Sequence, residues 1–397
     1  MMTKEDALRE AGVPIEPELT PSQTIVTALK ALGYSFRLNL CGMVVEVNGQ
    51  PLTDLLEAEI RTQMRDRGVK SMNAVEDAYK TDAKRNSYHP VRDYFKQLKW
   101  DGDDHISVLA SKITSDNDPV VYEDGSTLPL HAVYLYRWMI GAVAKVMHGE
   151  QNPMLTWDGP QGIGKSLLAR WLCPKQEWFI EAPINPQDKD CDVRLMSLFI
   201  WEVSELDATT RKADVSALKA FITKGKVTVR KSYGRNDVSG AAMCSFIGTV
   251  NNTTGFLADE TGSRRFYICR LTHIDWTYRD LDVDQLWAQA VSEYQAGASP
   301  HLTKEEKAAQ AAVNQRYEVE TPIRDWVQQY FTLTGDPDDA LTMGEVISHL
   351  AERGHRLSGS ERLQAMEIAR VLTQLKVQKE HTRNGNRWIG IAVKHSQ

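Results

Sequence analysis

One short segment constrains the fold of this chain more than any other. Residues Gly159–Ser166 read GPQGIGKS and fit the pattern G-x-x-x-x-G-K-[ST]. Glycines at these positions let the backbone curl, so that successive N–H groups point inward at an anion. The apolar run Met154–Trp157 precedes the segment, and apolar residues recur at helical spacing through Leu172. The sequence therefore predicts a buried strand, a phosphate-binding loop and a helix whose N-terminus faces the anion.

The residue types of this loop match the parts of a nucleoside triphosphate. Lys165 would place a positive charge against the β- and γ-phosphates, and the Ser166 hydroxyl would bind Mg²⁺. An ordinary glycine-rich turn is the alternative, but it needs neither the full pattern nor the flanking strand and helix. We therefore predict that the chain binds ATP together with Mg²⁺. The residues expected to contact the nucleotide are Gly159, Pro160, Gln161, Gly162, Ile163, Gly164, Lys165, Ser166 and Leu167.

The composition excludes several classes of protein. A chain of 397 residues with 42% hydrophobic and 25% charged residues is typical of a globular protein with two or three domains. Its five cysteines form no C-x-x-C pair, which argues against a zinc site or a disulfide framework. The N-terminus lacks the apolar core of a signal peptide, and the most apolar run, Leu135–Met147, contains two basic residues. We expect a cytoplasmic protein with no membrane partner.

An apolar run downstream of the loop ends in acidic residues. Leu198–Trp201 is predicted to be a strand, and Glu202-Val203-Ser204-Glu205 follows it. In P-loop ATPases one carboxylate at such a strand end holds Mg²⁺ and another orients the attacking water. We assign Glu202 to the metal and Glu205 to the water, but the usual adjacent Asp-Glu pair is absent and this division stays open. Two surface glutamates at a strand end are the structural alternative.

Two further polar groups follow buried strands. Asn251 comes directly after the predicted strand Met243–Val250, where an amide can hydrogen-bond the attacking water as a sensor. Arg264 and Arg265 precede the predicted strand Phe266–Cys269. Paired arginines are usually surface charges, but after this strand order either one is a candidate arginine finger for the γ-phosphate on an adjacent subunit.

The strongest charge feature lies between Arg211 and Arg235, where eight basic residues and one acidic residue give +7 in a chain of net charge −6. A helix is expected over 214–223, followed by a turn and a strand in which basic residues alternate with Val and Thr. Such a hairpin suits contact with a DNA backbone. A solvated surface, or cations aimed at a neighbouring subunit's nucleotide, are the alternatives. The predicted DNA-binding residues here are Lys224, Lys226, Arg230, Lys231 and Arg235.

A histidine precedes the proline that is expected to begin a short helix. His89 could be a catalytic acid or base, but no partner residues surround it in sequence. We interpret it as a turn or capping residue of the helix that Pro90 begins.

Five segments in this order resemble the virulence-associated E family of phages and mobile genetic elements. They are GPQGIGKS, WEVSELD, LKAFITKGKVTVRKSYGR, GTVN and DETGSRRF, and the upstream HPVRDYF and KWDG add to the similarity. The resemblance runs from about Tyr34 to Leu271. Several separate motifs make it far more specific than a phosphate-binding loop alone.

The resemblance implies an ATPase core similar to superfamily-three helicases and their AAA+ relatives, working as a hexameric ring on single-stranded or forked DNA. It further implies replication of a mobile element in a bacterial host cell, with host or phage replication proteins as partners. Residue by residue, it supports Lys165 and Ser166 for nucleotide and Mg²⁺, Glu202 and Glu205 for Walker B, Asn251 as sensor, Arg264 or Arg265 as finger, and the hairpin 224–235 as a pore element.

The C-terminal part has a different pattern. Helices are predicted over 322–331, 341–350 and 360–375, followed by two strands around Asn384-Gly385-Asn386. Three helices and a β-hairpin resemble a winged helix. Between Thr342 and Gln397, nine basic and five acidic residues give +4, and Arg383 and Arg387 flank the wing tip as predicted DNA contacts. Docking of another protein is the open alternative.

These features predict an α/β protein with a P-loop, AAA+-like core and a parallel sheet. The expected parts are a mostly helical region with a small hairpin (1–130), the ATPase core (131–300), a linker (301–320) and a winged-helix-like domain (321–397). The predicted function is that of an ATP-dependent DNA helicase or translocase. A nucleotide-switched DNA-binding or loading protein with slow hydrolysis is the alternative. A small-molecule kinase would not need the basic hairpin, and the N-K-x-D motif of GTPases is absent.

Overall fold

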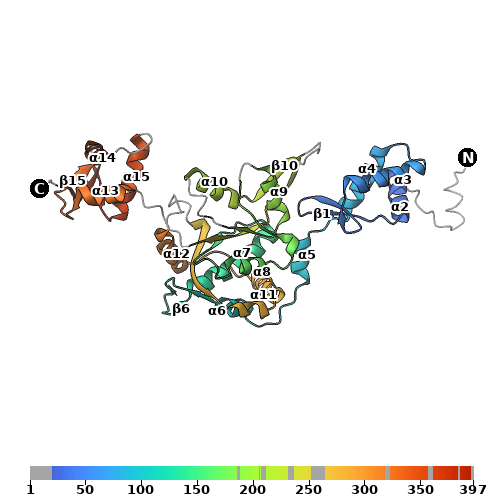
Figure 1. Cartoon of the computed structure of the whole chain (residues 1–397), viewed down its shortest axis with the longest axis horizontal. Helices are drawn as coiled ribbons and strands as arrows, with labels where there is room; N and C mark the ends of the chain where they lie inside the picture. The colour runs from blue at the N-terminus through green and yellow to red at the C-terminus, as the bar shows by residue number, and fades with distance from the viewer. Residues whose placement is uncertain are drawn as a thin grey trace, which may run out of the picture. The chain divides into compact units, whose positions relative to one another are not determined.

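The computed structural model describes residues 20–185, 188–204, 206, 212–230, 237–251, 264–317, 322–355, 361–382 and 385–394. The chain divides into two compact units, with the boundary between Glu318 and Val319 (Figure 1). Among the described residues, none of the helices combines the length and apolar character needed to cross a membrane.

The first unit begins with a small helical and stranded part that has its own core. Three helices, α2 (Pro21–Ala31), α3 (Asp54–Asp66) and α4 (Met72–Arg85), accompany an antiparallel sheet of β1 (Phe36–Asn39), β2 (Val44–Val47) and β3 (Gln50–Pro51). Phe36 of β1 stacks on Tyr79 of α4, with 5.2 Å between the ring centroids. The small hairpin predicted for this region is present as β1 and β2, which flank Cys41-Gly42, and a third short strand follows the turn at Asn48-Gly49.

His89 is the N-cap of the short helix α5 (Pro90–Gln97), so its interpretation as a capping residue is confirmed. Its Nδ1 accepts a hydrogen bond from the Arg92 backbone N–H at 3.3 Å. Burial, followed by the charge of Arg92, lowers the pKa of His89 to about 4. The imidazole is therefore neutral in the folded protein at neutral pH.

The lowered pKa of His89 predicts that the protein loses stability in mild acid. Since the folded-state pKa lies below the unfolded value of about 6.5, unfolding takes up a proton, and stability falls as the pH drops from about 6.5 toward 4. His89→Asn keeps a capping side chain but does not titrate. Urea denaturation at several pH values measures the free energy of unfolding. Between pH 6.5 and 4, this free energy should fall by about 1–3 kcal/mol less in the variant than in the original protein. Coinciding pH profiles would contradict the assignment.

A six-stranded sheet with the order β4-β13-β7-β12-β9-β8 forms the centre of the first unit. The strands from β13 to β8 are parallel, and β4 pairs antiparallel with β13. All residues of β7, β9 and β12 are buried, as is typical of parallel strands covered on both faces. The strands are β4 (Ile113–Ser115), β7 (Met154–Asp158), β8 (Phe179–Glu181), β9 (Ile200–Val203), β12 (Ser245–Val250) and β13 (Phe266–Ile274).

The four sheet strands predicted from apolar runs are confirmed as β7, β9, β12 and β13, with shifted ends. Glu202 lies inside β9, whereas the sequence placed it just after the strand. The strand β13 continues to Ile274, beyond the predicted end at Cys269, because its last residues pair with β4. The edge strand β4 itself has no counterpart among the predictions.

Helices cover this sheet. The long apolar helix α7 (Leu130–His148) packs on it, and Trp138 Nε1 donates a hydrogen bond to the Phe246 carbonyl at 3.1 Å. Trp287 of α11 (Val283–Gln295) is fully buried, and its Nε1 donates to the Leu172 carbonyl at 2.9 Å. The remaining helices of the core are α6 (His105–Ser111), α8 (Lys165–Leu172), α9 (Lys189–Ser197) and α10 (Lys212–Ile222), with the 3-10 turns η1 (Gln176–Trp178) and η4 (Trp276–Asp280).

The stretch 301–320, predicted as a linker, contains the helix α12 (Lys304–Arg316), which packs against β13. Its contact is made by polar residues. Gln310 Nε2 donates to the Arg264 and Phe266 carbonyls at 3.2 and 3.0 Å, and the buried Glu306 pairs with Arg137 at 2.9 Å. Since these partners lie in distant segments, no local pattern predicted that this stretch packs on the core.

The second unit contains the three helices α13 (Pro322–Tyr330), α14 (Met343–Glu352) and α15 (Glu361–Gln374), in the predicted order. The hairpin of β16 (Gln378–Thr382) and β17 (Gly385–Ile389) follows them. Three short strands complete the unit: β14 (Phe331–Leu333) pairs with β18 (Ile391–Val393), and β15 (Ala340–Thr342) pairs with β17. Trp388 of β17 is buried in the unit's core with apolar residues of all three helices.

Candidate functional site

The glycine-rich segment forms the loop between β7 and α8, so the predicted order of strand, loop and helix is confirmed. Gly159 and Gly164 have φ angles of +149° and +100°. A Cβ atom on Gly159 would lie 2.2 Å from the Leu271 carbonyl oxygen, and one on Gly164 would lie 2.9 Å from the Trp276 ring. These two positions therefore require glycine, both for the backbone conformation and for the close approach of their neighbours.

Lys165 begins α8, and its ammonium group folds back over the loop. Its Nζ donates to the Gly159 carbonyl at 2.6 Å, the Pro160 carbonyl at 3.0 Å and Asn251 Oδ1 at 3.2 Å. The side chain is only 6% exposed, and burial lowers its pKa. Asn251 follows β12, which is the parallel neighbour of β7. The sheet thus brings the lysine and the predicted sensor together.

Glu202 lies on the next strand, β9, and is fully buried. Neither of its carboxylate oxygens makes a hydrogen bond of good geometry with the residues that the structure describes, although the Ser166 and Thr249 hydroxyls lie close enough to lower its pKa. Burial raises the pKa of Glu202 to about 7, the nearby Ser166 hydroxyl acts to lower it, and the Glu181 carboxylate raises it further. A buried carboxylate beside a hydroxyl is the kind of site that a hard cation completes.

These residues fit Mg²⁺ of the kind that accompanies a nucleotide. Within the described ranges, no group of three or more His, Cys, Asp or Glu side chains could hold a metal by itself. A nucleotide-bound Mg²⁺ does not need such a group, because it takes one or two protein ligands together with phosphate oxygens and water. Ser166 and Glu202 are the residues that would hold it.

Arg264 and Arg265 lie at the other end of the sheet. Phe266, the next residue, pairs with Met154 at the start of β7, whereas the loop of Lys165 follows the end of β7. A five-residue strand spans roughly 16 Å. Neither arginine is therefore brought to the Lys165 of its own protomer.

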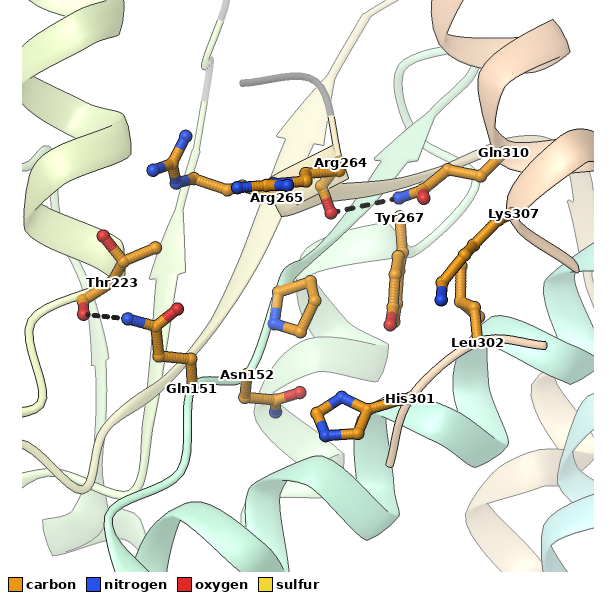
Figure 2. Close-up of a pocket in the computed structure, with 11 residues that line it drawn as sticks. Gln151, Asn152, Thr223, Arg264, Arg265, Tyr267, His301, Leu302, Lys307 and Gln310 are labelled. Atoms are coloured by element: carbon orange, nitrogen blue, oxygen red, sulfur yellow. Dashed lines mark hydrogen bonds between the residues drawn. The ribbon is translucent and has the colours of Figure 1, made fainter. Parts of the chain in front are cut away.

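The two arginines border a cleft of about 480 Å³ (Figure 2). Lys307 and His301, from the segment around the start of α12, lie on the other side of the opening. Among the described residues that line the cleft none is acidic, so these walls favour an anion. The lining residues are Gln151, Asn152, Pro153, Thr223, Arg264, Arg265, Tyr267, His301, Leu302, Lys307 and Gln310.

The predicted basic hairpin exists as β10 (Lys226–Arg230) paired antiparallel with β11 (Asp237–Ala241). Lys226 is exposed. Lys224, just before the hairpin, donates instead to Asp192 of α9 at 2.7 Å, and its ammonium lies 5.1 Å from the centroid of the Phe221 ring. This ion pair makes Lys224 a weaker candidate for DNA than the charge pattern suggested.

Several predicted site residues lie outside the described part of the chain, namely Glu205, Lys231, Arg235 and Arg383. Of Arg230 only the strand backbone is described, and Arg387 is exposed on β17.

Three residues close to the loop and to Glu202 were not predicted from the sequence. Thr249 acts on the pKa of Glu202, Tyr317 donates to the buried Asp158 at 2.8 Å, and Trp276 covers Gly164. Tyr317 and Trp276 lie over a hundred positions from the loop, and no local pattern marks them. Thr249 belongs to the GTVN segment, in which only Asn251 was given a role.

Fold and site define the class as a mixed α/β protein in which the carboxyl ends of a mostly parallel sheet carry a glycine-rich loop. Residues 95–319 match the family model of the virulence-associated protein E-like domain. This match spans more than half of the chain, and the chain belongs to that family. The resemblance found in the separate sequence segments is thereby confirmed.

Among solved structures, the chain is similar to apo forms of the NrS-1 C-terminal region. Its A form is 14% identical, with a TM-score of 0.45 over 94% of this chain and 100% of that chain. A further A-form structure of this region has a TM-score of 0.47 at the same 14% identity, over 93% and 99% of the two chains. No curated protein sequence matches the chain. The family assignment therefore comes from the family model.

Proposed function

We propose that the protein is an ATP-dependent DNA helicase or translocase that acts in the replication of a phage or other mobile genetic element. One observation carries the proposal. Lys165 and Ser166 begin α8 after the loop that follows β7, Asn251 directly follows β12, and Glu202 lies near the end of β9. These three strands are parallel neighbours, so the four residues lie at the carboxyl edge of one sheet. This is the edge at which open α/β sheets bind ligands. The arrangement supports a P-loop core of the AAA+ kind, similar to superfamily-three helicases.

Each residue has a distinct task in this proposal. The ammonium group of Lys165 would leave its loop carbonyls and bind the β- and γ-phosphates of ATP. Ser166 and Glu202 would hold Mg²⁺, which neutralises charge on the phosphate oxygens. Asn251 would orient the attacking water, and Glu205 is the proposed base for it.

The placement of Arg264 and Arg265 supports action between subunits. Because they lie at the amino end of the sheet, an arginine finger made by either would serve the nucleotide of an adjacent copy. A closed ring with head-to-tail contacts provides such a geometry at every interface. We propose a hexamer, as the resemblance to the family implies.

DNA contact is proposed for the basic hairpin and for the second unit. In the hairpin, Lys226 is the exposed cation whose side chain is described. In the second unit, the three helices and the hairpin β16–β17 support a winged-helix-like domain, with the exposed Arg387 as a DNA contact.

The function is tested by measuring ATP hydrolysis by the full chain with and without single-stranded DNA. We expect DNA to stimulate hydrolysis, and Lys226→Ala to reduce that stimulation several-fold while the DNA-free rate stays unchanged. The logarithm of the DNA-binding constant falls linearly with the logarithm of the salt concentration. Removal of one phosphate contact should make this slope less steep by about one unit. Lys70→Ala, which removes an exposed lysine between α3 and α4, is the matched control.

The outcomes separate the two function classes. Strand displacement driven by DNA-stimulated hydrolysis supports the motor. Slow hydrolysis that is indifferent to DNA, combined with DNA affinity that changes with bound nucleotide, would instead identify a nucleotide-switched loading protein.

A further inference from the structure

An exposed tryptophan lies directly beside the glycine-rich loop. Trp276 is 43% exposed, and it is the one aromatic residue among the exposed large apolar side chains of the described residues. It belongs to η4, which follows β13. An exposed aromatic ring beside a polar site can serve as a stacking surface for a planar ligand.

The surrounding residues hold the ring in place. Asp275 caps η4 and accepts from the Thr277 N–H at 3.0 Å and from Thr277 Oγ1 at 2.8 Å. Tyr278 is fully buried and packs edge-on against Trp171 of α8, with 5.1 Å between ring centroids. The Arg279 guanidinium lies 4.6 Å from the centroid of the Trp276 ring. Trp276 is thus fixed against α8 while much of its surface stays exposed.

The ring borders the glycine-rich loop where α8 begins. Its six-membered edge covers Gly164, the residue just before Lys165, closely enough that no Cβ fits there. Leu167, three residues further along α8, is 48% exposed. Ser166 lies in the first turn of α8, and the buried Glu202 carboxylate of β9 lies beside its hydroxyl. These two residues mark the phosphate and cation end of the site. A polar phosphate site is therefore bordered by an exposed aromatic ring and an exposed leucine.

We propose that Trp276 is the stacking platform for the purine base of the nucleotide bound at this loop, with Leu167 as its apolar neighbour. This inference rests on the proposed function, since it assigns the base to the same site. A planar base matches the exposed ring surface, since every base has a π-face that can stack on an aromatic side chain. Stacking gives affinity for the base without contributing to the phosphate contacts.

The test compares two probes of the same site by calorimetry, namely ATP and inorganic tripolyphosphate, each with Mg²⁺ and the full chain. Trp276→Ala should weaken ATP binding about tenfold, which is within the range for one base–aromatic stack, and leave tripolyphosphate binding unchanged. Trp276→Phe should retain most of the affinity, since it keeps an aromatic face. Leu55→Ala, at an 83% exposed leucine far from the loop in sequence, is the control.

Each other outcome is decisive. Unchanged ATP binding by Trp276→Ala overturns the inference and leaves the proposed function intact. Equal loss of both ligands, restored by Trp276→Phe, would mean that the ring supports the loop rather than the base. Loss of single-stranded DNA binding with unchanged ATP binding would assign the ring to DNA. If neither ligand binds the original protein, the proposed function itself fails.

Discussion

Replacing Lys165 with alanine is expected to reduce kcat/KM for ATP hydrolysis by about a thousandfold or more, because the transferred phosphate loses its cation. The fold should survive, since Leu168 and Leu172 anchor α8 in the core and are untouched. Far-ultraviolet circular dichroism and steady-state hydrolysis with Mg²⁺ check both parts of the expectation.

The control for this prediction is a cation on the same helix. Arg170 lies near the C-terminal end of α8 and is exposed, and its guanidinium donates to Gln176 Oε1 of η1. Arg170→Ala removes one positive charge from the same helix without touching the loop, so hydrolysis should change little. If Lys165→Ala hydrolysed ATP as fast as Arg170→Ala, the glycine-rich loop would not be the phosphate site.

The strands β7, β9, β12 and β13 were predictable because each one is a local apolar run, whereas the short edge strand β4 was not predicted. The glycine-rich loop was predictable for the same reason, since its glycines, lysine and serine are contiguous in sequence. The contact between Lys165 and Asn251 follows from a general rule of parallel sheets and not from the residues adjacent to them in sequence. The rule is that the carboxyl ends of neighbouring parallel strands lie at the same edge of the sheet.

Contacts between distant segments could not be predicted in this way. The helix α12 was taken for a linker because its buried face includes Glu306 and Gln310, whose partners lie in other segments. The ion pair of Lys224 with Asp192 likewise depends on how α9 meets the hairpin. Trp276 reaches Gly164 across more than a hundred residues of chain, and its residue type alone suggests only a core position.

Glu202→Gln is expected to stabilise the protein while it reduces hydrolysis by at least about a hundredfold, because a proposed Mg²⁺ ligand is lost. The stability effect follows from burial. With a folded-state pKa of about 7 against about 4.3 in the unfolded chain, the carboxylate destabilises the fold increasingly as the pH rises from about 4.3 to 7. Above pH 7 the whole penalty is present.

Glutamine carries no charge, so the variant should avoid this penalty. We expect it to be about 2–3 kcal/mol more stable than the original protein at pH 8, and to show a much smaller difference at pH 5. Urea denaturation without nucleotide at the two pH values measures this. Glu181 of β8 is the residue that pairs with Glu202 of β9, and its carboxylate is partly screened by solvent. Glu181→Gln should therefore change the free energy of unfolding and the hydrolysis rate far less.

A gain in stability coupled to a loss of turnover would identify Glu202 as a residue kept for chemistry at the expense of the fold. Natural sequences retain such strained polar groups mainly where function requires them. A variant that was equally stable at pH 5 and pH 8 relative to the original protein would contradict this, because it would show that the buried carboxylate is already compensated in the nucleotide-free protein.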